Sequence, residues 1–397
     1  MAGFKSKTAR QIALGVLNKF NVDAGDAPQI LGSIIDQTAQ RAQATDLVFG
    51  VIRNRLAIDM VVSTIAEVPV ERIQKKLLNI LRIGGYELIF APKTAEYAIV
   101  NEAVELSLLV AGKKQSGFVN AVLRNITRNI TSRTSDLTDA DIQRMLPQSP
   151  QFGCKFKAAI LPDPQRDPAG YLSKAFSLPK WLVTNWLSEF DFDKTRKICF
   201  ASNRRPGVFL QPNLLKTTVD GLVEKLIADD VKADEFEVIW QREMIKLKSN
   251  KLVSELSSFA EGLFTIQDPT AVLAALSLGP KPGWTIIDLC AAPGTKTVQM
   301  AWLMNNNGRI IATDINSDRL QKVDQNCRRL GITIVQTVGH DLLEEVVSKL
   351  PSCDAILLDV PCSNTGVLAR RPEVRLRIKP QVLISLAETQ LGLLEKA

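Results

Sequence analysis

The sequence predicts an α/β protein with a doubly wound parallel sheet in its C-terminal part, preceded by a small α+β module and an all-helical bundle. Three observations predict this order. After residue 263, short apolar runs alternate with helical patterns, which is typical of a parallel sheet. Before them, strand-like runs flank a helical pattern. Up to about residue 132, apolar residues recur only at helical spacing.

The composition is that of a globular protein with more than one domain. The chain has 397 residues, of which 46% are hydrophobic and 23% are charged, and this length usually gives two or three domains. No apolar run reaches the roughly 18 residues of a membrane helix, and the N-terminus has no apolar signal-peptide core. We therefore expect a cytoplasmic protein that has no membrane attachment. We also expect a monomer.

The cysteines and the single histidine limit the possible chemistry. The six cysteines are scattered and form no C-x-x-C pair, so a disulfide framework is not indicated. His340 is the one histidine, and its simplest interpretation is a loop residue after a strand. A His-based metal site or a Ser-His-Asp triad lacks its components. We expect no metal, and chemistry based on cysteine and carboxylate side chains.

Residues 1–132 are predicted to form the helical bundle. Gly84-Gly85 is expected to end or kink one of its helices. The region is basic, since residues 1–133 contain 17 Lys and Arg against 11 Asp and Glu, which suits a polyanionic partner. Arg124 and Arg128 lie four residues apart on one face of the last helix and could contact RNA phosphates. A solvated basic surface is the alternative.

Two regions separate this bundle from the parallel sheet. Residues 133–178 are rich in Thr, Ser, Asp, Gln and Pro and have no sustained period, so they are predicted to be a linker with a short helix near 139–145. Residues 179–262 combine helical patterns with strand-like runs at 207–213 and 236–240. They are predicted to form the small α+β module.

The most informative stretch is TIIDLCAAPGTKT, residues 285–297. A strand ends in a carboxylate, and a loop of small residues opens into a predicted helix, which is where α/β proteins bind polar groups of a nucleotide. Twenty residues beyond Gly294, a second strand ends in Asp314, an offset at which carboxylates bind ribose hydroxyls. The loop contains no G-x-G-x-x-G and no complete P-loop motif. The predicted ligand is a nucleoside without a diphosphate, for which S-adenosyl-L-methionine is the candidate.

A second stretch, DAILLDVPCS at residues 354–363, ends another predicted strand with Asp359 and Pro361-Cys362. Because the carboxyl ends of parallel strands line the ligand crevice, Cys362 is expected to face both cofactor and substrate. The alternative is that Cys362 is a buried, small hydrophobic residue that only contributes to packing. For Asp359 the alternative is a contact to the cofactor alone.

DLCAAPGTKT (288–297) and DVPCSNTG (359–366) resemble the first and fourth motifs of the Nol/Nop/Sun family, which comprises S-adenosylmethionine-dependent RNA cytosine-5 methyltransferases. The N-terminal region resembles a NusB-type RNA-binding domain, which points to the bacterial small-subunit ribosomal RNA branch of the RsmB/Sun/Fmu type. The resemblance implies a Rossmann-like methyltransferase domain over residues 263–397 and ribosomal RNA as the substrate.

The site residues follow from these motifs and from the distribution of charge. The expected cofactor-binding residues are Cys290, Ala291, Ala292, Pro293, Gly294, Thr295, Lys296, Asp314, Asp341 and Asp359. Thr295 stands where the family usually has glycine. The expected RNA contacts are Asn213, from the resemblance, and the basic residues Arg124, Arg128, Arg370, Arg371 and Arg375.

The resemblance also implies the chemistry. Cytosine C5 becomes nucleophilic after a thiolate adds to C6, and it then attacks a sulfonium methyl group. Asp359 would bind the N3 edge of the base and stabilise the charge that develops. Cys362 resembles the second, release-assisting thiol of the family, whose nucleophile lies in a later Thr-Cys or Ser-Cys motif.

That later motif does not occur in this sequence, which stops at Ala397 within the predicted helix that follows Cys362. We expect a fragment whose sheet lacks its last strands and has an open edge. An inactive homologue, and an enzyme in which Cys362 is itself the nucleophile, are the alternatives. The alternative function is a non-catalytic RNA-binding or ribosome-assembly protein with a degenerate methyltransferase domain.

Overall fold

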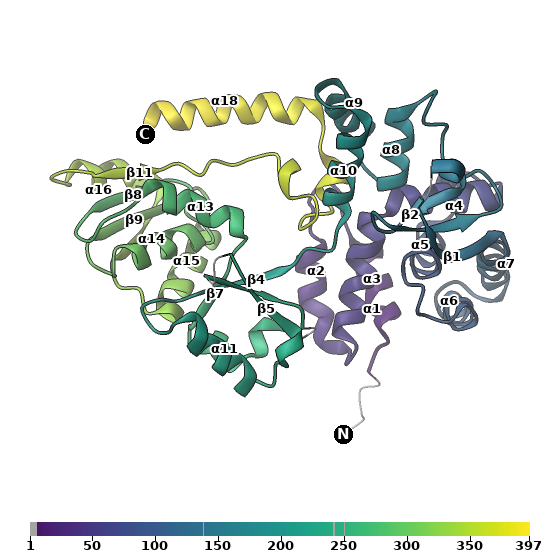
Figure 1. Ribbon diagram of the computed structural model, residues 1–397, viewed down its shortest axis with the longest axis horizontal. Coiled ribbons are helices and arrows are strands. Elements are labelled where there is room, and N and C mark those ends of the chain that lie inside the picture. Colours follow the sequence, from purple (N-terminus) through teal and green to yellow (C-terminus); the bar gives the residue numbers. More distant parts are fainter. Residues whose placement is uncertain (1–5, 138, 241–242, 250) are drawn as a thin grey trace. The chain divides into compact units, whose positions relative to one another are not determined.

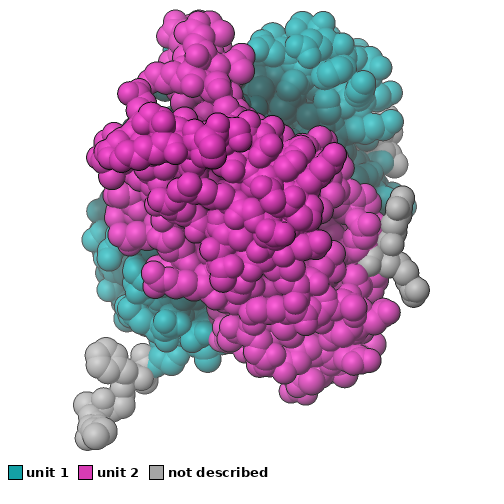
Figure 2. All heavy atoms as spheres, turned by 90° about the vertical axis from the view of Figure 1, so that its left-hand side faces the viewer, with its two compact units in different colours: residues 1–205, 363–382 teal, residues 206–362, 383–397 magenta. Residues whose placement is uncertain are grey.

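The computed structural model describes residues 6–137, 139–240, 243–249 and 251–397 and divides into two compact units, coloured separately in Figure 2. Unit 1 contains residues 1–205 and 363–382, and unit 2 contains residues 206–362 and 383–397. The chain therefore passes between the units three times. Within the described ranges, no helix is long and apolar enough to cross a membrane.

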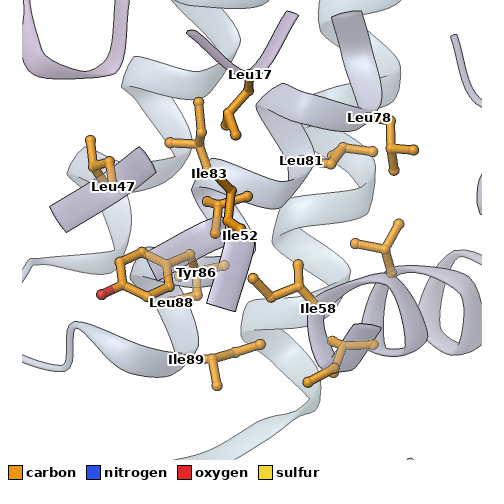
Figure 3. Close-up of a cluster of buried hydrophobic side chains, with 14 of the residues drawn as sticks. Leu17, Leu47, Ile52, Ile58, Leu78, Leu81, Ile83, Tyr86, Leu88 and Ile89 are labelled. Atoms are coloured by element: carbon orange, nitrogen blue, oxygen red, sulfur yellow. The ribbon is translucent and has the colours of Figure 1, made fainter. Parts of the chain in front are cut away.

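The N-terminal part of unit 1 is a helical bundle, as predicted. Its helices are α1 (Ala9–Lys19), α2 (Ala27–Ile34), η1 (Ile35–Gln37), α3 (Arg41–Arg53), α4 (Arg55–Ala66), η2 (Val70–Arg72), α5 (Lys75–Phe90), α6 (Glu96–Ala111) and α7 (Lys113–Asn129). Thr8 begins α1 with a capping box, in which it exchanges hydrogen bonds with Gln11. Figure 3 shows Leu17, Ile52 and Leu81 among the side chains that meet in the apolar core.

Helix α5 continues through Gly84-Gly85 to Phe90, so the predicted end of the helix at these glycines is wrong. Both glycines lie where neighbouring helices approach closely. A Cβ at Gly84 would be 2.9 Å from the end of the Leu123 side chain, and one at Gly85 would be 3.0 Å from Ile58 Cγ2. The glycines therefore permit close helix packing in a dense interior and do not terminate the helix.

Gly50 of α3 also lies at a close contact, and this contact allows a prediction about stability. The ring of Tyr86 lies directly over it, in the space that a Cβ would fill, and the Tyr86 hydroxyl is fixed by Asp46 and Arg205. Because the ring cannot move without breaking these bonds, Gly50→Ala should lower the free energy of unfolding by about 1–3 kcal/mol, as measured by urea denaturation.

Gly117 of α7 provides the matched control for this substitution. It is exposed, and a Cβ added there would have no neighbouring atom within 4 Å. Gly117→Ala should therefore stabilise the protein by about 0.4–1 kcal/mol. Equal effects of the two substitutions would contradict the close contact inferred at Gly50.

Residues 130–156 form a small antiparallel sheet where the sequence predicts part of a linker. β1 (Ile130–Asp136) pairs with β3 (Phe152–Phe156), which pairs with β2 (Met145–Pro147), and η3 (Asp139–Arg144) lies between β1 and β2. No residue of β1 is fully buried and its pairing is irregular, so the hydrophobic alternation that reveals a strand is absent.

Unit 1 is completed by three helices and a segment from much later in the chain. The helices are α8 (Pro168–Phe176), α9 (Lys180–Glu189) and α10 (Phe192–Asn203). Leu182, Val183 and Cys199 join the core of the bundle, so the helices at the start of the predicted α+β module pack within unit 1. The later segment contains η7 (Thr365–Val367) and α17 (Val374–Arg377) and adds Leu368 and Val374 to the same core.

Unit 2 begins with the small α+β module. Its antiparallel sheet has the order β5-β6-β4-β7. The elements are β4 (Val208–Pro212), α11 (Val219–Ala228), η4 (Ala233–Glu235), β5 (Phe236–Ile239), β6 (Met244–Leu247), η5 (Val253–Glu255), α12 (Ser257–Ala260) and β7 (Phe264–Ile266). Leu222 and Leu226 of α11 pack on Leu210 and Ile245 of this sheet.

The parallel sheet follows and has the order β10-β9-β8-β11. Its elements are α13 (Pro269–Leu278), β8 (Thr285–Asp288), α14 (Thr295–Leu303), β9 (Arg309–Asp314), α15 (Ser317–Leu330), β10 (Val335–Gly339), η6 (His340–Leu342), α16 (Leu343–Ser348) and β11 (Ala355–Leu357). Helix α18 (Pro380–Lys396) is divided between the units, with residues 383–397 in unit 2.

Both faces of the parallel sheet are covered, which confirms the predicted doubly wound fold. Alternate residues of the strands point to opposite faces. Ile286 and Ile310 pack with α14 and α15, whereas Ile287 and Ile311 pack with α16. Figure 1 shows these helices around the strands of the sheet.

Candidate active site

The carboxyl ends of the parallel strands bring the predicted cofactor residues to one edge of the sheet. Asp288 of β8 is in register with Leu357 of β11, and Asp314 of β9 is in register with Gly339 of β10. The strand order reverses at β8, because β9 and β10 lie on one side of it and β11 lies on the other. Ligands of open α/β sheets bind at such a switch point, so the site lies at the loops that follow β8 and β11.

The loop after β8 is held in place by helix α15. Arg319 Nη2 donates to the carbonyl oxygen of Ala292 at 2.8 Å, and Asn326 Nδ2 donates to that of Pro293 at 3.0 Å. Gly294 has a φ of +98°, and a Cβ there would be 3.1 Å from Val323 Cγ1, so glycine is needed for its conformation and for the close approach of α15. Residues 290–296 thus form a fixed wall at the start of α14.

Asp314 fits the role of a ribose-binding carboxylate. Its Oδ1 accepts a hydrogen bond from the Asn316 backbone at 3.0 Å and lies 3.5 Å from Arg319 Nη1. Within the described part of the chain, no donor bonds its other oxygen, Oδ2. The carboxylate is therefore oriented through one oxygen, and the second remains for the hydroxyls of a nucleoside. Asp341 follows β10 at the same edge and is exposed.

Asp288 lies beneath this loop and is only 1% exposed. Its Oδ2 accepts a hydrogen bond from Thr297 Oγ1 at 2.7 Å. Burial raises the pKa of Asp288 from 3.8 to about 6, although the Thr297 hydroxyl acts in the opposite direction. Thr297 is the third residue of α14, so this bond connects the end of β8 to the first turn of the helix.

The raised pKa of Asp288 predicts a stability that depends on pH. Because the folded state binds this proton more tightly than the unfolded state does, the contribution is complete below about pH 4 and is lost as the pH rises through about 6. Asp288→Asn should remove up to about 3 kcal/mol of this pH dependence. The test is to measure urea denaturation of both proteins from pH 4 to pH 7. A constant difference between the two free energies of unfolding across that range would contradict the prediction.

A salt bridge connects the loops at the switch point. Lys296 Nζ, in the first turn of α14, lies 2.5 Å from Asp359 Oδ2, which follows β11. Cys362 comes three residues later and is exposed, and the carbonyl oxygen of Pro361 accepts a hydrogen bond from Gln390 Nε2 of α18 at 2.8 Å. The exposed thiol therefore belongs to a loop that is tied to its surroundings on both sides.

Cys290, the other thiol at this edge, is suited to packing. It is half-buried, and burial raises its pKa to about 11, with the nearby carboxylate of Asp314 acting in the same direction. A thiol in this environment stays protonated at neutral pH, whereas nucleophilic cysteines act as thiolates. Cys290 is therefore suited to packing in the loop, and Cys362 is the exposed thiol of the pair; their roles remain predictions.

Two of the expected RNA contacts are wrong, because their side chains are buried. Asn213 is fully buried and donates to the carbonyl oxygens of Gly262 and Leu330 at 2.9 and 2.8 Å. Arg375 is 3% exposed and lies in the interior of unit 1. Its guanidinium donates to the carbonyl oxygens of Arg53, Phe176, Ser202 and Leu368 and to the side chain of Asn203.

The side chains of the other expected RNA contacts are at least partly exposed, as contact with RNA requires. Arg124, Arg128 and Arg371 are exposed, and Arg370 is partly buried. Their role remains a prediction. Three residues that position the two loops, Arg319, Asn326 and Gln390, were not anticipated from the sequence, because each acts through single hydrogen bonds and carries no local motif.

In the described residues, no group of three or more His, Cys, Asp or Glu side chains could hold a metal ion. The geometry of the site suits a nucleoside ligand, with a carboxylate, a helix N-terminus and an exposed thiol at one edge of the sheet.

Comparisons with known proteins cover nearly the whole chain. Residues 275–397 match the family of the 16S rRNA methyltransferase RsmB/F, residues 7–128 match the NusB family, and residues 178–253 match the ferredoxin-like domain of RsmF/B-like methyltransferases.

The curated relatives have consistent names. The chain is 30% identical to the probable ribosomal RNA small subunit methyltransferase B of Synechocystis sp., over 89% of this chain and 73% of the relative. It is 28% identical to the protein of the same name from Bacillus subtilis, over 99% of this chain and 82% of the relative. The crystal structure of PH0851 has a TM-score of 0.71 at 22% identity and covers 99% of this chain and 83% of that one, which shows a shared fold.

The methyl donor of such enzymes is S-adenosyl-L-methionine, and the residues at the switch point fit it, because Asp314 keeps one carboxylate oxygen for a ribose and the loop after β8 has no diphosphate cradle. On the strength of these matches and this geometry, the chain belongs to the RsmB/F family of 16S rRNA methyltransferases.

Proposed function

We propose that this methyltransferase acts on C5 of a cytosine in small-subunit ribosomal RNA, through a cysteine adduct at C6 of the base. One observation carries the proposal. The exposed thiol of Cys362 lies three residues after Asp359, whose carboxylate is bound by Lys296 from the cofactor loop. A base that reaches Cys362 therefore also meets the carboxylate of Asp359, which is fixed relative to the wall formed by residues 290–296.

The residues of the chain have distinct roles in this proposal. Asp359 hydrogen-bonds the N3 edge of the cytosine and shares a proton with N3, which neutralises the negative charge that develops there when a thiolate adds to C6. That addition places the electron pair on C5, which makes this carbon the nucleophile. S-adenosyl-L-methionine, when bound, supplies an electrophilic methyl group. Lys296 fixes the position of the Asp359 carboxyl group next to the loop after β8.

Release of the product requires that the C5 proton leaves and that the bond between sulfur and C6 breaks. In the proposal, Cys362 Sγ takes part in this adduct chemistry, either by accepting the C5 proton or by being the sulfur that adds to C6. Asp314 and the backbone of residues 290–296 hold the cofactor during both steps.

The test is to locate the methyl group. Small-subunit ribosomal RNA is incubated with the protein and with S-adenosyl-L-methionine that carries a labelled methyl group, and the RNA is digested to nucleosides for mass spectrometry. We expect the label in 5-methylcytidine. A label on another atom of the nucleoside would overturn the C5 assignment. RNA binding without any transfer would favour the non-catalytic alternative.

A further inference from the structure

A large cleft lies within unit 1, and none of its lining residues belongs to the methyl-transfer site. Its volume is about 1110 Å³, and its walls come from α3, α5, α8, α10 and the segment 147–150. Sites for single small molecules measure roughly 300–1,000 Å³. The cleft is therefore large enough for an extended ligand that occupies it with more than one chemical group.

The charge of the cleft is strongly positive. Its lining includes one carboxylate, that of Asp193, and six cationic residues. The cations are Arg53, Lys93, Arg196, Lys197, Arg204 and Arg205. Arg205 is paired with Asp46 at 2.8 Å. Lys93, Lys197 and Arg204 are exposed and form no ion pair with any residue that the structure describes. These three charges are available to a polyanion.

Aromatic rings lie among these cations. The rings of Tyr86 and Phe90 are stacked, with centroids 5.7 Å apart, and Phe176 and Phe200 meet edge to face at 4.7 Å. Phe90 and Phe200 are only partly buried, so part of each ring faces the cleft. Basic grooves that contain aromatic rings are typical of sites for single-stranded nucleic acid, because every base can stack on a ring while cations follow the backbone.

The floor of the cleft contains a buried donor without a partner among the described residues. Arg53 is 6% exposed, and its Nη2 donates to the carbonyl oxygen of Ala369 at 3.1 Å. Its Nε forms no hydrogen bond with any residue that the structure describes. An unsatisfied buried donor is costly. Arg53 therefore adds to the cleft lining a buried positive charge whose hydrogen-bonding capacity is not fully used.

We propose that this cleft is a second RNA site, which binds an unpaired stretch of two or more nucleotides by base stacking on Phe90 and Phe200 and by phosphate contacts to Lys93, Lys197 and Arg204. Paired bases are stacked inside a duplex and cannot reach the rings, so the cleft selects single-stranded RNA. An acidic peptide would match the charges but would leave the rings unused. The proposal goes beyond methyl transfer, since it places no reacting group in the cleft.

The experiment measures binding of a fluorescent, unstructured RNA oligonucleotide to the whole chain by anisotropy, over a range of salt concentrations and without cofactor. Lys197→Gln and Arg204→Gln should each weaken binding and reduce the slope of log K against log salt by about 0.7. Phe90→Leu keeps an apolar side chain but removes the ring, and it should weaken binding by about 5-fold or more with an unchanged slope.

Lys19→Gln is the matched control, because Lys19 is an exposed cation of unit 1 outside the cleft. It should leave both affinity and slope unchanged. Thermal denaturation of each variant shows whether the fold is intact. Unchanged affinity in the two charge variants would overturn the proposal, and so would equal affinity for duplex RNA, or displacement of the RNA by an acidic peptide. Failure of the cytosine-5 assignment would leave these binding results unaffected.

Discussion

Cys362→Ala should lower the rate of methyl transfer at least about 100-fold, the usual scale for loss of a group that moves a proton or forms the adduct. Cys362 is the exposed thiol at the switch point, and Cys290 cannot replace it because burial raises the pKa of Cys290 to about 11. The measurement is single-turnover transfer of a labelled methyl group to small-subunit ribosomal RNA.

Cys353→Ala is the matched control for this experiment. Cys353 is also exposed, but its Sγ lies against the carbonyl oxygen of Thr285 at the start of β8, which is the opposite edge of the sheet. Its replacement should leave the rate within a factor of about two, the scale of a surface substitution away from the site. An unchanged rate in Cys362→Ala would contradict the proposed role.

Denaturing gels of the reacted Cys362→Ala variant distinguish the two roles of this thiol. If Cys362 removes the C5 proton, the variant should accumulate a covalent complex of protein and RNA, because elimination is blocked. If Cys362 is the nucleophile, no such complex should form. Given the loss of rate in the variant and activity in the unsubstituted chain, either result assigns the step in which Cys362 acts.

Arg375→Met should destabilise unit 1 by about 3–5 kcal/mol, which is among the largest effects of a single substitution. The guanidinium donates to acceptors from α3, α8, α10 and its own segment, and methionine would leave these buried acceptors unsatisfied. Burial lowers the pKa of Arg375 to about 9, and the neighbouring charge of Arg53 acts in the same direction. Urea denaturation, followed by hydrogen exchange in α3 and α10, measures the loss.

Arg371→Met tests whether the loss is specific to the buried position. Arg371 lies four residues before Arg375 but is exposed, so its replacement should change the free energy of unfolding by less than about 0.5 kcal/mol. A similar, small effect of both substitutions would show that the buried hydrogen bonds of Arg375 contribute little to stability.

The parallel sheet could be predicted from the sequence because its signals are local. Asp288, Gly294 and Asp314 stand at strand ends and in a turn whose residue types are set by neighbours in the chain. The pleat of a half-buried strand and the N-terminus of a helix leave patterns within a dozen residues. The loops that carry the candidate site could therefore be proposed before any tertiary contact was known.

The errors arose where distant contacts decide the outcome. Arg371 and Arg375 are identical in type and four residues apart, yet one is exposed and the other is buried against α3, α8 and α10, whose acceptors lie 172 or more residues away in sequence. Gly84 resembles a helix stop because its contact, Leu123, lies on another helix. β1 was missed because its partner, β3, supplies the pairing while its own side chains stay partly exposed.

The division of unit 1 into two stretches of sequence has a consequence for its biosynthesis. Proteins emerge from the ribosome N-terminus first, and N-terminal domains usually finish folding before the rest is made. Here the core that begins with Ala9 is completed by Leu368, Val374 and Ile378. The first domain to appear must therefore wait until all of residues 206–362 have been made, and a nascent chain stopped at residue 205 would expose an apolar surface that only later translation can cover.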